Sequence, residues 1–218
     1  MYNVAFIPVR AGSKSINNKN IALINNKPLI YWTVSTACNS DLDRVYVSTD
    51  SSEIKKVVED FGFCNVEVIA RSPESASDKA TSETALIEFC EKYKFDNVVF
   101  LQATSPLTTK NDINGALQKF LTSDKKSLVS VINRHQFIWG TNGMPQNYNP
   151  LQRPRRQDWD GYYIENGAFY ISSRDEILKS GCRITPPVEF WKMSQNSLFE
   201  IDEPEDIKIV ERFFNDNF

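Results

Sequence analysis

Short apolar runs alternate with stretches of helical periodicity along most of this 218-residue chain. Apolar runs rich in β-branched and aromatic residues predict strands, and apolar residues that recur every three or four positions predict helices. We expect strands at residues 3–8, 44–48, 66–70, 97–102, 127–132 and 167–172. We expect helices at residues 28–38, 51–61, 80–93, 111–121, 174–179 and 203–215.

This alternation is typical of a parallel sheet with helices on both faces. Residues 98–101 and 128–132 are apolar on both sides, as buried parallel strands are. The pattern therefore predicts an α/β fold, a Rossmann-like three-layer sandwich with a mostly parallel central sheet. The length suits one domain covering residues 1–218.

The alternation lapses between residues 134 and 165, where Gln, Asn, Pro and aromatic residues gather. Long connections in compact domains are usually either functional or disordered. This insertion could be a lid, a dimerisation arm or a long surface loop. We interpret residues 134–165 as an arm inserted into the single domain.

The composition excludes several classes of protein. Hydrophobic residues make up 41% of the chain and charged residues 24%, which is ordinary for a globular protein, and the net charge of −3 disfavours nucleic acid as a partner. A single histidine, His135, disfavours a zinc site. No apolar run is long enough to cross a membrane, and a strand replaces any signal peptide at the start, so we expect a cytoplasmic location.

The four cysteines are widely spaced and form no CxxC pair: Cys38, Cys64, Cys90 and Cys182. They lie in apolar segments, so we expect buried free thiols.

Residues 7–20 form a cationic loop directly after the first predicted strand. Gly12 and Ser13 allow its backbone to curl around an anion, and Arg10, Lys14 and Lys19 add three positive charges. The glycine spacing fits neither a P-loop nor a dinucleotide fingerprint. The loop predicts a nucleoside triphosphate site, and the alternative is a solvated basic surface loop.

Polar side chains follow several of the predicted strands. Asp50 follows the second strand, Arg71 the third, and residues 102–107 the fourth. Ligands of open α/β sheets bind beyond the carboxyl ends of the strands. We therefore expect these groups and the cationic loop to meet at one edge of the sheet.

Six segments, in this order, resemble the motifs of one family: residues 7–14, 19–21, 47–50, 101–107, 166–170 and 201–202. The family is the acylneuraminate cytidylyltransferases, or CMP-sialic acid synthetases. The resemblance implies a nucleotide-diphospho-sugar transferase fold and CMP transfer from CTP to the anomeric hydroxyl of a nine-carbon 2-keto sugar acid, with Mg²⁺ and release of pyrophosphate. It also implies a homodimer in which an arm of one subunit closes the site of the other.

The resemblance assigns roles by position. The CTP-binding residues would be Arg10, Ala11, Gly12, Ser13, Lys14, Lys19, Asn20, Arg71 and Ser82. The sugar-binding residues would be Gln102, Thr104, Ser105, His135, Arg156, Gln157, Asn166, Gly167, Phe169 and Tyr170. The catalytic residues would be Arg10, Lys14 and Asp202.

Glu200 and Asp202 are the candidate metal ligands. Alternate residues of an extended segment point to the same side, and Mg²⁺ prefers one or two carboxylates together with phosphate oxygens. The family usually has Asp where this chain has Glu200. The alternative is that these acids only precede a helix, whose N-terminus favours negative charge.

The acceptor sugar stays open at this point. Ile164 stands where some relatives have an arginine, which leaves room for a bacterial analogue such as legionaminate or pseudaminate. The sequence is also compatible with a cytidylyltransferase for 3-deoxy-octulosonate, with a sugar-1-phosphate transferase, and with a non-catalytic nucleotide-binding protein.

Overall fold

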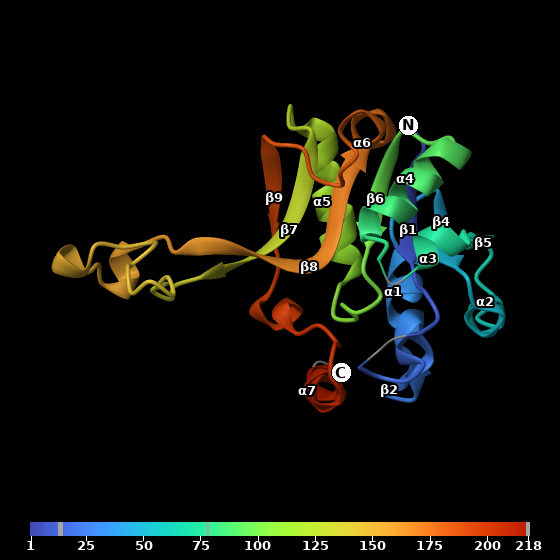
Figure 1. Cartoon of the computed structure of the whole chain (residues 1–218), viewed down its shortest axis with the longest axis horizontal. Helices are drawn as coiled ribbons and strands as arrows, with labels where there is room; N and C mark the ends of the chain where they lie inside the picture. Colours follow the sequence, from blue (N-terminus) through green and yellow to red (C-terminus); the bar gives the residue numbers. More distant parts are fainter. Residues whose placement is uncertain (13–14, 78, 217–218) are drawn as a thin grey trace.

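The computed structural model describes residues 1–12, 15–77 and 79–216, and seven of the strands among them form one central sheet (Figure 1). In spatial order these are β5 (Val66–Ala70), β4 (Arg44–Thr49), β1 (Asn3–Pro8), β6 (Asn97–Leu101), β8 (Tyr162–Ser173), β7 (Ser127–Arg134) and β9 (Val188–Lys192). The α-helices are α1 (Leu29–Cys38), α2 (Ser52–Glu59), α3 (Pro73–Ala76), α4 (Ser82–Lys92), α5 (Lys110–Thr122), α6 (Arg174–Ser180) and α7 (Pro204–Asp216). The remaining elements are a hairpin of β2 (Leu23–Ile24) and β3 (Lys27–Pro28) and the 3₁₀ turns η1 (Lys19–Ile21), η2 (Pro150–Gln152), η3 (Arg156–Asp158) and η4 (Gln195–Leu198).

The sheet is mostly parallel, as the sequence predicts. Strands β5, β4, β1 and β6 pair in parallel, and so do β7 and β9. In the described sheet, β8 is the strand that runs antiparallel to both of its neighbours. Because of this reversal, the first half of β8 lies at the carboxyl end of β6, where Phe169 pairs with Leu101.

Two hydrophobic clusters on opposite faces of the sheet make the three layers. In β1, Ala5 and Ile7 pack in a cluster with residues of α1, α2 and α5. The alternate residues Val4 and Phe6 pack in a second cluster with residues of α4 and α6. Successive strand side chains point to opposite faces, so a continuous apolar run serves both layers.

A third, smaller cluster ties the end of the chain to its beginning. Ile24 and Leu29 pack there against Ile201 and two residues of α7, Val210 and Phe214. This contact holds the segment around Ile201 next to the loop that follows β1, which matters for the site described below.

The boundaries of the expected helices and strands lie close to the prediction, but α3, the β2–β3 hairpin and some features of β8 and β9 were not expected. Ser51 is the N-cap of α2, and its hydroxyl accepts a hydrogen bond from the Ile54 N–H at 3.2 Å. Pro28 takes the N-cap position of α1, just before its first turn. Strand β9 was not expected, and β8 begins at Tyr162, ahead of the expected start at residue 167.

All four cysteines are free thiols, but their burial differs. Cys90 is buried, as expected, whereas Cys38 and Cys182 are half-buried. The expectation was wrong for Cys64, which is exposed because it lies in the turn between α2 and β5.

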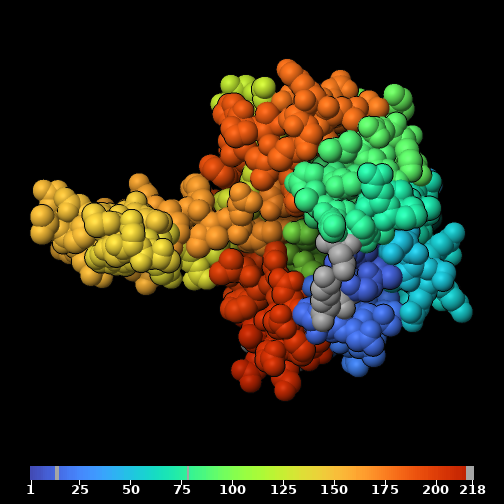
Figure 2. Space-filling model, viewed as in Figure 1, coloured from blue at the N-terminus to red at the C-terminus, as the bar shows by residue number. Residues whose placement is uncertain are grey.

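Residues 135–161 leave the sheet between β7 and β8 and project away from the body of the molecule (Figures 1 and 2). We call this segment the arm. The rings of Phe137 and Trp159 stack with centroids 5.1 Å apart, and the Arg153 guanidinium lies 4.3 Å from the Phe137 centroid. Residues 162–165, which the sequence grouped with the insertion, belong to β8 and pair with β7.

No helix in the described ranges combines the length and the apolar character that crossing a bilayer would require.

Candidate active site

The loop after β1 is anchored to its neighbours by several polar contacts. The Ala11 N–H donates to Asp50 Oδ1 at 2.8 Å, and the Asn20 side-chain amide donates to the Arg10 carbonyl at 3.1 Å. Gly12 adopts the left-handed region with φ of 76°, where a side chain would be strained. Two residues expected in this loop, Ser13 and Lys14, lie outside the described residues.

The same loop contacts the segment that precedes α7. Lys19 Nζ lies 3.0 Å from Asp202 Oδ1, and the Ser15 hydroxyl donates to the Asp202 carbonyl. The Lys19 side chain is only 15% exposed and that of Asp202 is 63% exposed, so the carboxylate faces the opening while the ammonium is held inside. Residues 183 positions apart thus bring opposite charges into one place.

Beside this loop, a cavity of about 490 Å³ extends past the ends of β4 and β5. Its lining includes Asp50, Arg71 and Ser77, and the Arg10 guanidinium donates to the Ser77 carbonyl at 3.4 Å. Burial lowers the pKa of Arg71 from its ordinary value; the Asp50 carboxylate opposes this effect and the Arg10 charge reinforces it. Two guanidinium groups close together favour an anionic ligand.

Glu88 of α4 supports the segment that follows Arg71. Its Oε2 accepts hydrogen bonds from the hydroxyls of Ser72 and Ser75, at 2.9 Å and 2.5 Å, and its Oε1 pairs with Lys92 at 2.6 Å. Burial opposes ionisation, but the hydrogen bonds from Lys92 and the two serines outweigh it and lower the pKa of Glu88 to about 2.

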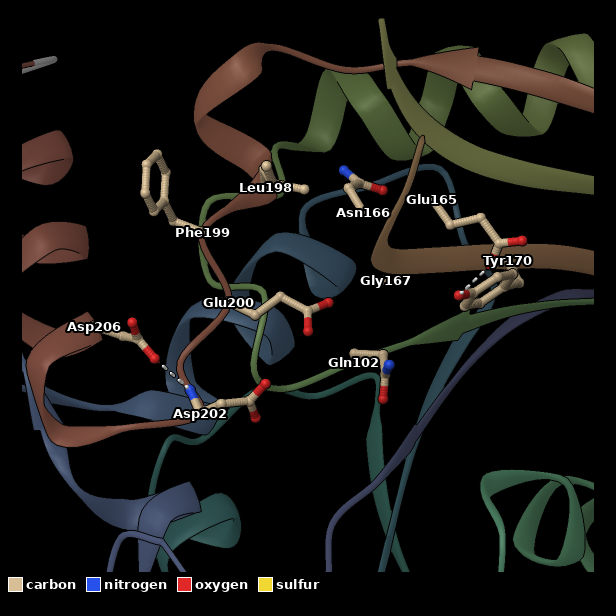
Figure 3. A pocket seen from close by; sticks show the side chains of 10 residues that line it. All are labelled: Gln102, Glu165, Asn166, Gly167, Tyr170, Leu198, Phe199, Glu200, Asp202 and Asp206. Atoms are coloured by element: carbon tan, nitrogen blue, oxygen red, sulfur yellow. Dashed lines mark hydrogen bonds between the residues drawn. The ribbon is translucent and has the colours of Figure 1, made fainter. Parts of the chain in front are cut away.

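A pocket of about 430 Å³ opens at the carboxyl end of β6 (Figure 3). It is lined by Gln102, Glu165, Asn166, Gly167, Tyr170, Leu198, Phe199, Glu200, Asp202 and Asp206. Four of these residues carry carboxyl groups, and none of the described lining residues is basic. In Figure 3 the side chains of Gln102, Glu200 and Asp202 project toward the same space.

Glu200 lies against the backbone of β8. A Cβ added at Gly167, where φ is 68°, would stand 2.9 Å from the Glu200 Cδ and collide with its Oε1. The Ser105 hydroxyl donates to the same Oε1 at 3.4 Å. Burial, followed by the nearby Asp202 charge, raises the pKa of Glu200.

Ile201 fixes the spacing of the two acids. Its side chain is fully buried, and its N–H donates to the Thr104 carbonyl at 2.8 Å. The flanking Glu200 and Asp202 therefore both face the pocket. Asp206 has a different task, since its Oδ2 accepts from the Asp202 and Glu203 N–H groups at 3.0 and 2.8 Å and so organises the start of α7.

A divalent cation fits this pair of acids. Glu200 and Asp202 offer hard oxygen donors, and the Asp202 charge disfavours charge on Glu200, which a cation between them would relieve. The described part of the chain holds no cluster of three or more His, Cys, Asp or Glu arranged for a metal. A site built on these two residues would need further oxygens from phosphate groups or water.

The structure brings most of the expected residues to this edge of the sheet. Around the 430 Å³ pocket lie Gln102, Asn166, Gly167, Tyr170, Glu200 and Asp202, with Thr104 and Ser105 in contact with the acidic segment. A smaller cavity of about 80 Å³ is lined by the loop residues Arg10, Ala11, Gly12, Lys19 and Asn20, and Arg71 lines the cavity beside it.

Several expected residues lie elsewhere. The Phe169 side chain is fully buried in the sheet core, and Ser82, the first residue of α4, lines none of these three cavities. His135, Arg156 and Gln157 lie on the arm, where His135 meets the Trp159 ring at a centroid distance of 6.0 Å.

Sequence reasoning missed four lining residues: Glu165, Leu198, Phe199 and Asp206. Glu165 directly precedes the expected Asn166 and Gly167, so the start of β8 was the available signal. Asp206 is an acidic residue at the start of a predicted helix, and the sequence does not show whether such a residue caps the helix or lines a pocket.

Comparison with known proteins gives consistent matches. A family model described as "Cytidylyltransferase" matches residues 4–217. N-acylneuraminate cytidylyltransferase B of Danio rerio is 37% identical over 219 residues, covering 97% of this chain and 51% of that protein. N-acylneuraminate cytidylyltransferase of Streptococcus agalactiae serotype V is 30% identical over 234 residues, covering 99% and 54%. The chain spans about half the length of these curated relatives.

Two solved structures share the fold. CMP:2-keto-3-deoxy-manno-octonic acid synthetase, complexed with CTP, aligns over 100% of both chains with a TM-score of 0.76 and 18% identity. 4-Diphosphocytidyl-2C-methyl-D-erythritol synthase of Anaerococcus prevotii aligns over 98% of this chain and 96% of the other, with a TM-score of 0.73 and 13% identity. Both confirm the expected α/β architecture.

Proposed function

This chain belongs to the cytidylyltransferase family, and we propose that it transfers CMP from CTP to the anomeric hydroxyl of a nine-carbon 2-keto sugar acid, releasing pyrophosphate. The relatives named N-acylneuraminate cytidylyltransferase, at 30–38% identity, support an acceptor of the sialic acid class.

The observation that carries the proposal is the contact between the first loop and the acidic segment. Lys19 Nζ and Asp202 Oδ1 form an ion pair at 3.0 Å, and the Ser15 hydroxyl donates a hydrogen bond to the Asp202 carbonyl. A triphosphate held by the loop would therefore lie next to the carboxylates that suit a divalent ion. Phosphoryl transfer depends mainly on such positioning and on charge neutralisation.

In the proposed reaction, the anomeric hydroxyl of the acceptor loses its proton to solvent and its oxygen forms a bond to the α-phosphorus of CTP. The bond from that phosphorus to the bridging oxygen breaks, and pyrophosphate leaves with its electron pair. Arg10, Lys14 and Lys19 would neutralise the charge that grows on the departing phosphates. Backbone carbonyls and an amide oxygen at this edge can accept hydrogen bonds from the exocyclic amine that distinguishes cytosine from uracil.

Asp202 and Glu200 would hold Mg²⁺ together with phosphate oxygens. When bound, the ion would offset phosphate charge and help to activate the acceptor hydroxyl. Asp202 is the stronger candidate ligand because it is more exposed, and the longer Glu200 side chain reaches the same pocket.

The acceptor sugar would occupy the 430 Å³ pocket, and a second copy of the chain would contribute residues of its arm to that pocket. A sugar carboxylate needs a cation, yet the described lining residues are acidic or neutral. Arg156 and Gln157 are exposed on the projecting arm, and Trp139 and Leu151 of the arm are 53% and 93% exposed. A homodimer in which each arm reaches the other subunit's pocket would supply the missing guanidinium, whose fork suits a carboxylate.

The test is pyrophosphate release with CTP, Mg²⁺ and a panel of ulosonic acids that includes N-acetylneuraminate, legionaminate, pseudaminate and 3-deoxy-octulosonate. Turnover with a nine-carbon acid supports the proposal. Turnover restricted to octulosonate would move the assignment to that class, and CTP binding without any turnover would leave a nucleotide-binding protein.

A further inference from the structure

Tyr170 and Glu165 lie across the pocket from Asp202 in Figure 3. The Tyr170 phenol donates a hydrogen bond to Glu165 Oε2 at 3.2 Å. Burial, followed by the Glu165 charge, raises the pKa of Tyr170 to about 12, so the phenol stays protonated and keeps donating. An ionised carboxylate has two acceptor oxygens, so Glu165 can accept a further hydrogen bond from a ligand in the pocket.

An arginine outside the pocket holds the Tyr170 ring from behind. The Arg183 guanidinium lies 5.0 Å from the Tyr170 centroid and 4.9 Å from that of Phe100. Its Nε and Nη2 donate to the two carboxylate oxygens of Glu83 at 2.5 and 3.1 Å. Bidentate geometry fixes the plane of a guanidinium, and here that plane packs beside the ring.

This chain of contacts links three elements to one pocket wall. Glu83 belongs to α4, Arg183 follows α6, and Tyr170 lies in β8. The side chains of Arg183 and Glu83 are only 17% and 24% exposed, so the pair is better shielded from solvent than an ordinary surface ion pair. Arg183 does not line the pocket and would act on a ligand only through Tyr170.

The orientation of an acceptor follows from charge, if the proposed function holds. Its anomeric carbon must lie near the triphosphate, at the Asp202 end. In a 2-keto acid the carboxylate is bonded to that same carbon, so it also lies there. The opposite end of the sugar then reaches Glu165, which is a hydrogen-bond acceptor and would repel a second carboxylate.

We propose that Glu165 is a specificity-determining residue that accepts a hydrogen bond from a hydroxyl or amide N–H at the end of the acceptor remote from its anomeric carbon, and that Arg183 positions it through Tyr170. The inference rests on the proposed function and deepens it. Under this inference, the choice of sugar acid depends on Glu165, Tyr170 and Arg183 of one subunit as well as on the arm of a second subunit.

The first test compares Glu165→Gln with the wild-type chain in steady-state kinetics, using N-acetylneuraminate as acceptor. This variant replaces the charged Glu165 carboxylate by a neutral amide. It is expected to raise the KM for the sugar acid about tenfold, while the KM for CTP stays within about twofold. Tyr170→Phe removes the supporting phenol and should change the acceptor KM in the same direction.

The positioning role needs a readout that general destabilisation would not give. Arg183→Met should raise the acceptor KM and leave the CTP KM unchanged, and combining it with Glu165→Gln should add little further effect. Arg183→Lys should restore part of the loss. Arg44→Met is the matched control, because it breaks another Arg–Glu pair, Arg44 to Glu67 at 2.9 Å, away from the pocket.

An unchanged KM for the sugar acid in Glu165→Gln would overturn the inference. Turnover by the wild-type chain would in that case still support the proposed function. Equal changes in both KM values for Arg183→Met, or fully additive effects in the double variant, would overturn the positioning role. A wild-type chain that turned over no acid at all would overturn the proposed function and this inference with it.

Discussion

Gly167→Ala is the substitution for which the structure gives the sharpest expectation. Gly167 has φ of 68°, and a left-handed residue with a Cβ costs about 1–2 kcal/mol. The new Cβ would also overlap the Glu200 carboxylate, standing 2.9 Å from its Cδ. Overpacking of this kind costs about 1–3 kcal/mol more. We expect a lower free energy of unfolding and, because Glu200 must move, a loss of turnover.

Gly62→Ala separates the two effects. Gly62 has φ of 71°, but nothing lies within 4 Å of a Cβ built on it. This control should show the backbone strain alone, with normal turnover, because Gly62 lies in the turn after α2. For a chain of this size, each kcal/mol corresponds to about 2–4 °C in Tm.

The assay combines thermal unfolding with the Mg²⁺ dependence of pyrophosphate release. Gly167→Ala should lose more Tm than Gly62→Ala, and the extra loss should shrink when Glu200→Ala is added to it. If the two glycine variants showed equal Tm losses and equal activities, the proposed contact between Gly167 and Glu200 would be refuted.

Three further predictions concern single side chains. Lys14→Ala should lower kcat about 10²–10³-fold, as loss of one transition-state donor does, whereas the exposed Lys55→Ala should not change it; equal kcat values would remove Lys14 from the phosphate site. Asp202→Asn should raise the Mg²⁺ concentration needed for half-maximal turnover, and an unchanged requirement would count against it as a ligand. Because the pKa of Glu88 is depressed to about 2, its contribution to stability is complete above its ordinary value near 4.5 and is lost as pH falls toward 2. Urea midpoints measured from pH 6 to pH 2 should therefore fall less steeply for Glu88→Gln than for the wild type, with the exposed Glu91→Gln as control; parallel curves for all three would contradict the assignment.

Much of the fold follows from the hydrophobic pattern. The runs that form β1, β6 and β7 are apolar over most of their length, which locates these strands, and the Ser51 hydroxyl caps the start of α2. Strand direction does not follow, because an apolar run looks the same in either direction. The antiparallel course of β8 is therefore a tertiary result.

Strand β9 escaped sequence analysis because Glu189 and Lys192 interrupt its apolar residues. The structure pairs the strand with β7 and links Glu189 to Lys119 of α5 at 2.8 Å. Such edge strands depend on tertiary pairing more than on local pattern.

The candidate site divides along similar lines. The loop after β1 and the acids near residue 201 are recognisable by their charge, but their contact through Lys19 depends on how α7 packs. Glu165 could not be identified, because its role depends on a ring and a guanidinium contributed by distant segments. Arm residues such as Arg156 act, in our proposal, only at the pocket of a second subunit, and the sequence of one chain does not show how two subunits are arranged.

The most direct test of the central claim is a crystal structure of this chain with CTP and Mg²⁺. We predict that the triphosphate lies along the loop that contains Gly12 and Lys19, with Mg²⁺ at about 2.1 Å from an Asp202 carboxylate oxygen and from phosphate oxygens. A triphosphate bound away from that loop, or a metal ion without Asp202 among its ligands, would contradict the account.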